Sequence, residues 1–324
     1  MTVVVTGAAG FIGYHVTIAL LARGEQVVGI DIVNDYYDVG LKEARLAHLA
    51  GFKGFTFHRA DIADPEAVAT ILAGAGKVTG VVHLAAQAGV RYSLKNPYAY
   101  VHSNLLGQVT MFECVRALDP APAFVYASSS SVYGGNDKFP FSVSDRVDHP
   151  VSLYAATKRG GELLAESYAA IYGMQSTGLR FFTVYGPWGR PDMAYFSFTK
   201  AMLAGEPIPV FNEGKLERDF TYIDDIVAGV LAALDRPAQL GKPHRIYNLG
   251  NNKPEPLMRF IKAIETALNC KAVLDFQPMQ PGDVKATAAD IADSTRDLGF
   301  LPSIGIDEGI PRFVRWFKDY YGIA

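Results

Sequence analysis

The segment Thr2-Val3-Val4-Val5-Thr6-Gly7-Ala8-Ala9-Gly10-Phe11-Ile12-Gly13 decides the fold. A short β-branched strand runs into three glycines, and residues of helical period follow at Tyr14–Arg23. Glycines in such a turn permit a tight bend and a close approach of the backbone to a pyrophosphate, whose charge the free N–H groups of the helix start attract. A Gly-rich turn without a ligand has the same letters, so the surrounding sequence must decide between the two.

Strands and helices alternate over the first half of the chain. The expected strands are Thr2–Val5, Gln26–Ile30, Phe55–His58, Val78–Leu84 and Ala123–Ala127, and the expected helices are Tyr14–Arg23, Pro65–Leu72, Tyr98–Leu118 and Leu153–Tyr172. Apolar strands that alternate with helices form a parallel sheet covered on both faces. We therefore predict an α/β fold with a doubly wound parallel sheet of the Rossmann type.

Asp31 stands at the end of the second strand, eighteen residues beyond Gly13. A carboxylate there accepts hydrogen bonds from both ribose hydroxyls and repels a 2′-phosphate, and no arginine follows nearby to bind one. This context favours a bound dinucleotide over an empty turn, and NAD over NADP. The predicted pyrophosphate turn comprises Gly7, Gly10, Phe11, Ile12 and Gly13.

Further cofactor contacts are expected where the third and fourth strands end, because an open α/β sheet binds its ligand at the carboxyl ends of its strands. These residues are Asp61, Ile62, Leu84, Ala85 and Ala86. The small side chains at positions 85 and 86 let a dinucleotide lie against the backbone. Asp61 has an equally good alternative role as the cap of the helix that begins at Pro65.

The alternation weakens after residue 180. Gly, Pro and aromatic residues gather at Tyr185–Pro191, Glu206–Gly214 and Asn248–Pro256, between helical stretches at Phe196–Ala204, Asp224–Leu234 and Leu257–Leu268. Long ordered loops usually carry binding residues. We predict an NAD-binding domain over residues 1–180, and over residues 181–324 mainly a smaller α/β substrate-binding lobe, some of whose segments return to the first domain.

Composition narrows the classes of partner. The 324 residues are 49% hydrophobic with a net charge of −3, and the charges are spread along the chain, which argues against a nucleic-acid or membrane-binding patch. Cys114 and Cys270 lack metal-ligand spacing, so we expect two buried reduced thiols, no disulfide and no metal site. No apolar run reaches the ~20 residues of a membrane span, and Met1–Val5 lacks signal-peptide features. A small-molecule partner and a cytoplasmic location follow.

Tyr154-Ala155-Ala156-Thr157-Lys158 places a phenol and an ammonium on one helix face. A neighbouring ammonium, together with a positive nicotinamide ring, favours the phenolate and lowers the tyrosine pKa from its usual value of about 10. The preceding strand ends in a serine run, of which Ser129 or a neighbour is placed to hold a reacting oxygen and share its proton with Tyr154. Without the glycine motif upstream, a polar turn would explain the serines equally well.

Six motifs in this order resemble the extended short-chain dehydrogenases/reductases, the nucleotide-sugar epimerase and dehydratase family. They are TGAAGFIG at 6–13, HLAA at 83–86, SSSSVYG at 128–134, YAATK at 154–158, LRFFTVYGPWGR at 179–190 and RDFTYIDD at 218–225. The likeness covers essentially the whole chain. It implies that Ser129, Tyr154 and Lys158 are the catalytic set, with Tyr154, Lys158 and Phe181 also at the cofactor.

The residues after Ser129 bear on the reaction. Sugar dehydratases of this family carry an Asp-Glu pair there, which elimination of water needs as extra acid and base, whereas this chain has Ser130-Ser131. The segment at 182–190 is similar to that of the UDP-glucuronate 4-epimerases, as are Gln87–Ser93 and Met279–Asp283. UDP-galactose 4-epimerases have Asn where Thr183 stands. The resemblance therefore implies reversible C4 epimerisation of a UDP-uronic acid, through a 4-keto intermediate, with NAD recycled.

The same resemblance assigns the substrate contacts. Thr183 and Arg190 would bind the C6 carboxylate, Arg190 with its fork geometry. Gln280 departs from the galactose enzymes, which have an arginine on the diphosphate, whereas Arg218 is retained with Asp283 nearby. Gln87, Ser129 and Ser130 complete the predicted set, and Arg91 is equally well explained as a solvated side chain or as a ligand for a phosphate or carboxylate.

Several alternatives stay open at this point. A UDP-glucuronate decarboxylase and a 4-epimerase of neutral UDP-hexoses share the motifs, and a non-catalytic dinucleotide sensor would need only the first domain. The helices at Tyr98–Leu118 and Leu153–Tyr172 carry apolar residues on more than one face, including Val101, Leu105, Val109 and Phe112. In the family such helices commonly pair two subunits, so we expect a homodimer; the alternative is that both helices simply cover the sheet.

Overall fold

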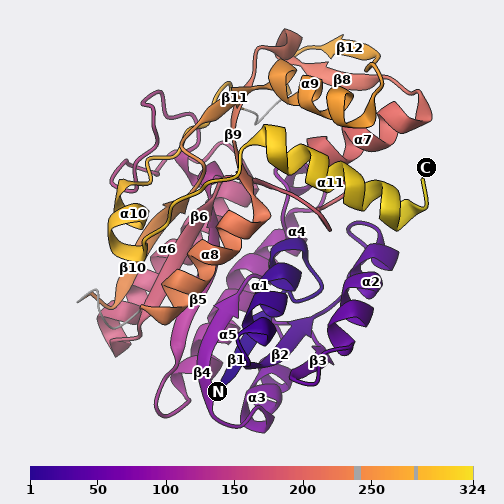
Figure 1. Cartoon of the computed structure of the whole chain (residues 1–324). Helices are drawn as coiled ribbons and strands as arrows, with labels where there is room; N and C mark the ends of the chain where they lie inside the picture. The colour runs from indigo at the N-terminus through magenta and orange to yellow at the C-terminus, as the bar shows by residue number, and fades with distance from the viewer. Residues whose placement is uncertain (237–241, 281–283, 324) are drawn as a thin grey trace.

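The computed structural model describes residues 1–236, 242–280 and 284–323, and a seven-stranded sheet forms its centre (Figure 1). The strands lie in the order β10-β6-β5-β4-β1-β2-β3, and all neighbours are parallel. Their bounds are β1 Thr2–Thr6, β2 Gln26–Asp31, β3 Phe55–Arg59, β4 Val78–His83, β5 Ala123–Ser129, β6 Ser176–Phe181 and β10 His244–Leu249. The predicted doubly wound parallel sheet is confirmed.

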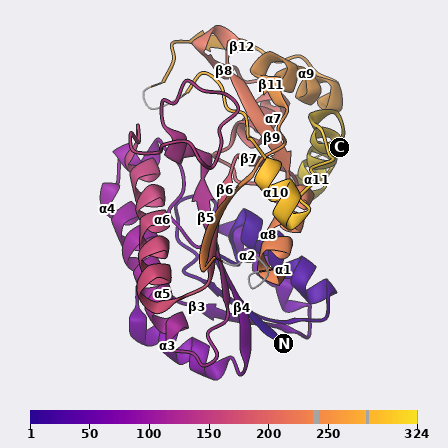
Figure 2. The same cartoon turned by 90° about the vertical axis from the view of Figure 1, so that its left-hand side faces the viewer.

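Helices cover both faces of this sheet, as Figure 2 shows. One face carries α1 (Phe11–Ala22) and α8 (Ile223–Asp235), with α2 (Val39–Ala50) beside α1, and the other carries α3 (Pro65–Gly74), α5 (Gly107–Arg116) and α6 (Leu153–Tyr172). Side chains alternate along each strand, so Val3 and Val5 belong to one buried cluster and Val4 to the other. Helix α2 was not among the expected helices.

The expected helix at Tyr98–Leu118 is divided into three pieces. It consists of α4 (Pro97–Tyr100), a π-helical turn η2 (Val101–Leu106) and α5. Inside the π turn, the buried side chain of Asn104 accepts a hydrogen bond from Gln87 N at 2.8 Å and donates to Gln87 O at 3.0 Å. A π turn typically occurs as such a local insertion, which changes where the following side chains point.

The other elements described after residue 182 form two small sheets and four helices, of which α10 packs on β10 and α8 of the central-sheet half. A three-stranded sheet has the order β11-β9-β7, and β12 pairs with β8. The bounds are β7 Thr183–Tyr185, β8 Ile208–Phe211, β9 Glu217–Tyr222, β11 Pro254–Pro256, β12 Leu274–Gln277, α7 Ala194–Ala204, α9 Leu257–Leu268, α10 Ala292–Leu298 and α11 Ile306–Tyr321. Three short 3₁₀ turns are η1 Tyr92–Leu94, η3 Ser130–Tyr133 and η4 Asn212–Gly214.

Two segments expected to be loops contain strands. β8 lies within Glu206–Gly214, and the end of β10 and all of β11 lie within Asn248–Pro256. Each of these strands pairs with a partner distant in sequence, so no local hairpin pattern reveals it. Two elements of the second half also join the first half of the molecule, since β10 pairs with β6 and α8 packs on α1 and the central strands.

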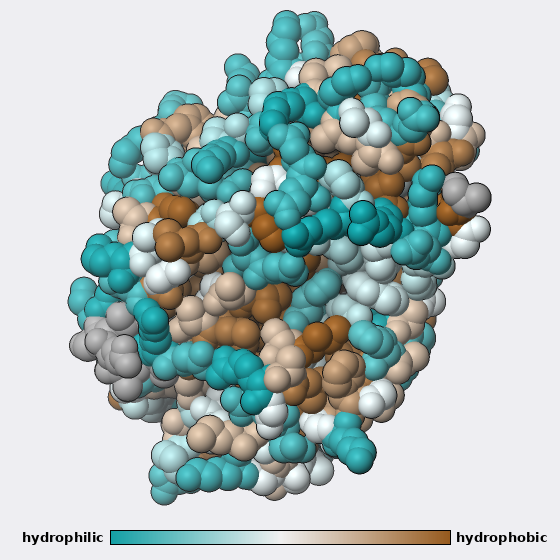
Figure 3. All heavy atoms as spheres, viewed as in Figure 1, coloured by the Kyte–Doolittle hydropathy of each residue, from teal (hydrophilic) through white to brown (hydrophobic). Residues whose placement is uncertain are grey.

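The surface in the view of Figure 3 mixes hydrophilic side chains with small hydrophobic groups. Both cysteine side chains are free, but they are partly exposed, with Cys114 on α5 and Cys270 just beyond the end of α9. The expectation of full burial is therefore wrong. Among the helices that the structure describes, none combines the length and apolar character that a membrane crossing demands.

Candidate active site

A cleft of about 1270 Å³ runs over the carboxyl ends of the central strands and is closed by residues of the second lobe. Pockets for one small ligand usually measure about 300–1000 Å³, so this cleft has room for two. All the predicted site residues that the structure describes line it. They are Gly7, Gly10, Phe11, Ile12, Gly13, Asp31, Asp61, Ile62, Leu84, Ala85, Ala86, Gln87, Arg91, Ser129, Ser130, Tyr154, Lys158, Phe181, Thr183, Arg190 and Arg218. Asp283 lies outside the described residues.

The glycine turn leaves no space for side chains. Gly7 has φ +73°, and a Cβ on Gly13 would lie 2.0 Å from the carbonyl oxygen of Gly7. The turn is closed by a hydrogen bond from Gly10 N to Gly7 O at 2.9 Å. Helix α1 begins here without a side-chain cap, so its first N–H groups face the cleft. This cradle fits the pyrophosphate of a dinucleotide.

Asp31 ends β2 at the rim of the same turn. Its carboxylate accepts hydrogen bonds from Ala9 N at 3.1 Å and Val33 N at 2.8 Å. Burial raises the pKa of Asp31, and the bond from Val33 and the positive charge of Lys42 oppose the rise. A carboxylate held this way suits the ribose hydroxyls, which agrees with the expected preference for NAD.

The structure decides between the two roles weighed for Asp61. Helix α3 is capped by Asp64, which accepts from Glu66 N at 3.0 Å and Ala67 N at 3.1 Å. Asp61 instead accepts from Ala63 N at 2.9 Å, and its other oxygen lies 2.7 Å from His102 Nε2. The capping role is therefore wrong, and Asp61 faces the cleft.

Ser129, Tyr154 and Lys158 come together where β5 ends and α6 begins. Ser152 caps α6 by accepting from Ala155 N at 3.1 Å, which places Tyr154 in the first turn with Lys158 one turn later. Burial raises the pKa of Tyr154, while a hydrogen bond with Ser129 and the charge of Arg190 oppose the rise. Ser129 and Tyr154 therefore lie close enough to interact, and their role as a catalytic pair stays a prediction. The expected lowering of the phenol pKa by Lys158 does not occur in the chain alone.

Lys158 has a different partner. Its Nζ donates to Ala127 O at 2.9 Å, and burial lowers its pKa to about 8, an effect that Glu162 opposes. A buried ammonium with a pKa this low exchanges protons readily near neutral pH. In the chain alone, Lys158 is therefore tied to the end of β5.

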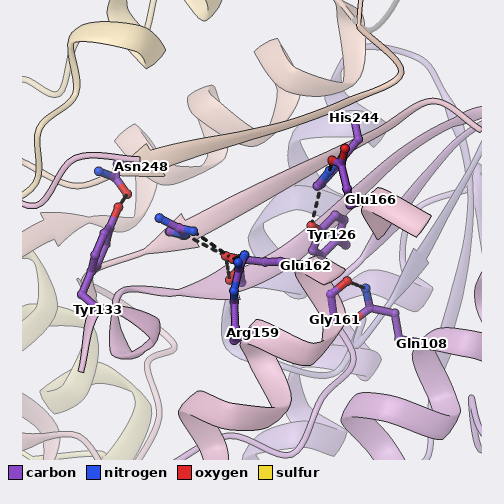
Figure 4. A network of polar contacts seen from close by, with 11 residues as sticks. Gln108, Tyr126, Tyr133, Arg159, Gly161, Glu162, Glu166, His244 and Asn248 are labelled. Atoms are coloured by element: carbon purple, nitrogen blue, oxygen red, sulfur yellow. Dashed lines mark hydrogen bonds and ion pairs between the residues drawn. The ribbon is translucent and has the colours of Figure 1, made fainter. Parts of the chain in front are cut away.

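A buried ion-pair network supports this corner of the cleft (Figure 4). Glu162, on α6, receives two hydrogen bonds from Arg180 at 2.8 and 2.9 Å, one from Ser128 Oγ at 2.6 Å and one from Arg159 at 3.0 Å. The pKa of Glu162 is lowered, because these hydrogen bonds and the charge of Arg180 outweigh the effect of burial. The network joins α6 to β5 and β6, and so fixes Tyr154 relative to Ser129.

The expected carboxylate site, here called the carboxylate end of the cleft, is formed by residues that follow β6. Thr183 opens β7, and Arg190 follows in the loop at 186–192. Asp192 binds Nε of Arg190 at 3.0 Å and Nη2 at 2.6 Å, and it also accepts from the Tyr36 hydroxyl at 3.1 Å. One edge of the guanidinium fork is therefore taken by Asp192, and Nη1 does not take part in that pair.

The remaining predicted substrate residues that the structure describes also line the cleft. Arg91 lies over the Phe211 ring at 4.7 Å, and Arg218 donates to Glu217 O at 2.9 Å and to Lys285 O at 3.2 Å. Gln87 is buried and Ser130 half-buried. Within the described ranges, His, Cys, Asp and Glu side chains form no cluster of three or more that would hold a metal ion.

Several side chains that shape the cleft were not predicted from the sequence. Asn104 holds the backbone of Gln87 and donates to Thr157 Oγ1 at 3.0 Å, next to Lys158. Its one available signal was a polar residue inside an apolar helical pattern. Tyr36 and Asp192 lie in loops, where no periodicity marks them, and only the tertiary structure brings them together.

Comparison with known proteins agrees with this geometry. Residues 3–250 match the NAD dependent epimerase/dehydratase family. The chain is 50% identical to UDP-glucuronate 4-epimerase 4 of Arabidopsis thaliana, covering 99% of this chain and 76% of that protein. The crystal structure of UDP-glucuronic acid 4-epimerase from Bacillus cereus with UDP-glucuronic acid and NAD superposes with a TM-score of 0.92 at 34% identity, covering 99% of this chain and all of that one.

A UDP-glucose 4-epimerase is also similar, but more distantly. The enzyme from Thermotoga maritima with UDP-glucose has a TM-score of 0.88 at 28% identity, covering 99% of this chain and all of that one. The glycine turn, the serine at the end of β5 with the tyrosine and lysine of α6, and a match over more than half of the sequence lead to one assignment. This chain belongs to the NAD dependent epimerase/dehydratase family.

Proposed function

We infer that this chain is an NAD-dependent enzyme that interconverts UDP-glucuronate and UDP-galacturonate by inverting C4. The observation that carries the inference is a single cleft with a dinucleotide cradle, a tyrosine–serine pair between its two ends, and an arginine and a threonine opposite. The relatives named for UDP-glucuronate match this chain at higher identity than the one named for UDP-glucose.

NAD supplies the removal and return of hydride at C4, so the reaction has no net oxidation. Tyr154 takes the proton of the 4-hydroxyl as hydride leaves C4, which produces a 4-keto sugar. Ser129 holds the same oxygen, and Tyr154 returns the proton when hydride comes back to the opposite face. Lys158 is held one turn further along α6 by its bond to Ala127 O, and the positive nicotinamide ring of bound NAD would favour the phenolate form.

The 4-keto sugar is a β-keto acid, which loses CO₂ when its C5–C6 bond aligns with the carbonyl π system. Thr183 and Arg190 hold the C6 carboxylate out of this alignment, so binding geometry selects epimerisation over decarboxylation. The rest of the substrate lies toward Arg218 and Arg91, which carry the diphosphate charge, and Gln87 and Ser130 contact the sugar. The Asp283 contact stays a prediction from sequence.

The direct test is to incubate the purified protein with UDP-glucuronate, without added reductant, and to follow the products by NMR and mass spectrometry. We expect UDP-galacturonate at unchanged mass. A product lighter by CO₂ would identify a decarboxylase. Turnover of UDP-glucose with none of UDP-glucuronate would identify a neutral-sugar epimerase, and binding of NAD with no turnover would leave only a dinucleotide sensor.

We also propose that the protein is a homodimer paired through α5, α6 and the π turn between α4 and α5. An apolar surface hollow there is lined by Leu105, Leu106, Val109, Gly160, Leu163 and Leu164, and the side chains of Leu106 and Leu163 are exposed. Apolar patches of this kind usually mark interaction sites. Light scattering should give twice the mass of the 324-residue chain for wild type and a single chain mass for Leu163→Glu. A monomeric wild type would refute the dimer.

A cytoplasmic location completes the proposal. Free Cys114 and Cys270 suit a reducing compartment, and NAD and nucleotide sugars are the expected partners there. Fractionation of cells that express the tagged protein tests it, with recovery in the cytosolic fraction as the expected result.

A further inference from the structure

The loop before Arg190 is held by two side chains of the cofactor-binding half. Three consecutive carbonyl oxygens of this loop accept hydrogen bonds from them. His15 Nε2 lies 2.9 Å from Pro187 O, and Arg45 Nη2 donates to Trp188 O at 2.6 Å and to Gly189 O at 3.2 Å. His15 follows the glycine turn on α1, and Arg45 lies on α2. The loop is therefore held in part from outside the second lobe.

Arg45 also reaches the cofactor cradle. Its Nη1 donates to Ala9 O, within the glycine turn, at 2.7 Å and to the Tyr37 hydroxyl at 2.8 Å. The side chain is fully buried, so one guanidinium bridges the glycine turn and the loop at 187–189. Burying a cation is costly unless it is hydrogen-bonded, and both Nη atoms of Arg45 have partners, whereas its buried Nε has none. The positions of the carbonyl oxygens that accept from Nη1 and Nη2 are therefore strongly preferred.

The backbone at Trp188 requires such support. Trp188 has φ +59°, a left-handed conformation that a bulky residue keeps only when its surroundings fix it. Its ring packs against Tyr14 on one side and against Trp316 and Tyr320 of α11 on the other, at centroid distances of 5.2–5.3 Å. The direction in which the chain leaves Trp188 determines where Arg190, two residues later, presents its guanidinium.

We propose that Arg45, assisted by His15, is a positioning residue for recognition of the substrate carboxylate. It fixes the turn at 187–189 and thereby places Arg190, from the same half of the molecule that holds the cofactor. This inference rests on the proposed function of the cleft. Arg45 itself need not touch the substrate.

The test measures binding of UDP-glucuronate and UDP-glucose by calorimetry to full-length protein saturated with NAD. The variants are Arg45→Met, Arg190→Ala and the double variant. Arg45→Lys keeps the buried charge but cannot bond both loops at once, which provides a milder change if Arg45→Met does not fold. Arg23→Met is the matched control, because Arg23 is an exposed arginine whose ion pair joins it to Asp235 at 2.9 Å.

Arg45→Met should weaken UDP-glucuronate binding by roughly tenfold or more and UDP-glucose binding much less, within the range of typical coupling between sites. Arg45→Lys should show a smaller loss with the same selectivity, and Arg23→Met none. In the Arg190→Ala background, Arg45→Met should add little, since both act on the same contact. Two results would overturn the proposal. One is that Arg45→Met weakens binding of UDP-glucuronate and UDP-glucose equally, and the other is that it weakens UDP-glucuronate binding as much in the Arg190→Ala background as in wild type. A wild type that does not prefer UDP-glucuronate would instead refute the proposed uronate function.

Discussion

The two ends of the cleft achieve their geometry in different ways. At the cofactor end, backbone atoms make the site, and side chains are excluded because a Cβ on Gly13 would lie 2.0 Å from Gly7 O. At the carboxylate end, the backbone is strained at Trp188 and is held by side chains more than a hundred residues away in sequence. The first end is rigid by local sterics, whereas the second depends on tertiary contacts. Changes at the two ends should therefore have separable effects.

The largest effect should come from between the two ends. Tyr154→Phe removes the proton acceptor while keeping the ring, so we expect turnover to fall by about 10²–10⁴-fold. Binding of NAD and of UDP-glucuronate should remain, because neither end is altered. Stopped-flow turnover and calorimetry measure the two quantities, with Tyr172→Phe, an exposed residue on the same helix, as control. Loss of binding together with turnover would mean that Tyr154 also shapes the ends.

At the cofactor end, Gly13→Ala forces a methyl group against a carbonyl oxygen. Overpacking of this kind destabilises proteins by about 1–3 kcal/mol, and here it also closes the pyrophosphate turn. We expect NAD binding to be lost in a fluorescence titration. Gly74→Ala is the matched control, because a Cβ there meets nothing within 4 Å and alanine favours the helix by roughly 0.5–1 kcal/mol. Unchanged NAD affinity in Gly13→Ala would contradict the steric account.

At the carboxylate end, Arg190→Ala removes a charged hydrogen-bond donor. Such bonds contribute about 1.5–3 kcal/mol, which corresponds to roughly ten- to hundredfold weaker binding of UDP-glucuronate. UDP-glucose and NAD should bind as before, and mass spectrometry should detect CO₂ loss from the freed carboxylate. If the variant shows neither weaker binding of UDP-glucuronate nor release of CO₂, Thr183 and Arg190 do not form the carboxylate site.

The smallest expected effect concerns stability as a function of pH. Burial lowers the pKa of His15 from 6.5 to about 4, so between these values the unfolded chain binds more protons than the folded one. The free energy of unfolding should therefore fall as the pH drops from 6.5 to 4, by about 2 kcal/mol from this residue between pH 7 and pH 5. Urea unfolding at both pH values measures the difference. His15→Gln should remove the contribution of His15 to the pH dependence of the unfolding free energy, whereas His149→Gln, at an exposed histidine, should leave it unchanged. An equal pH dependence in wild type and both variants would refute the assignment to His15.

The cofactor end could be predicted from sequence almost completely. A glycine turn, a strand-terminal Asp31 and a strand–helix alternation are local patterns whose physical cause acts within a few residues. The structure places all these residues on one cleft, and the five expected strands all occur. Helix spacing likewise indicated Tyr154 and Lys158, and the strand end indicated the serine run, whereas the choice of Ser129 within that run came from the family resemblance.

The carboxylate end was predictable only in part. Resemblance to a family led to Thr183 and Arg190, but not to Asp192, which occupies one edge of Arg190, nor to Arg45. Arg45 lies outside every helix expected from the sequence, and its burial is set by contacts with Ala9 and Trp188. No local pattern predicts the π turn or the strands β8, β11 and β12, because their partners are distant in sequence.

The return of β10 to the sheet has a consequence for synthesis and for engineering. On the ribosome, β6 emerges long before its neighbour at His244–Leu249, so the growing chain exposes an unpaired strand edge, which is a template for pairing with other chains. A fragment cut after residue 181 would keep that edge permanently and would also lack α8. The cofactor-binding unit is thus discontinuous, and transplanting it into a chimera requires two segments, not one.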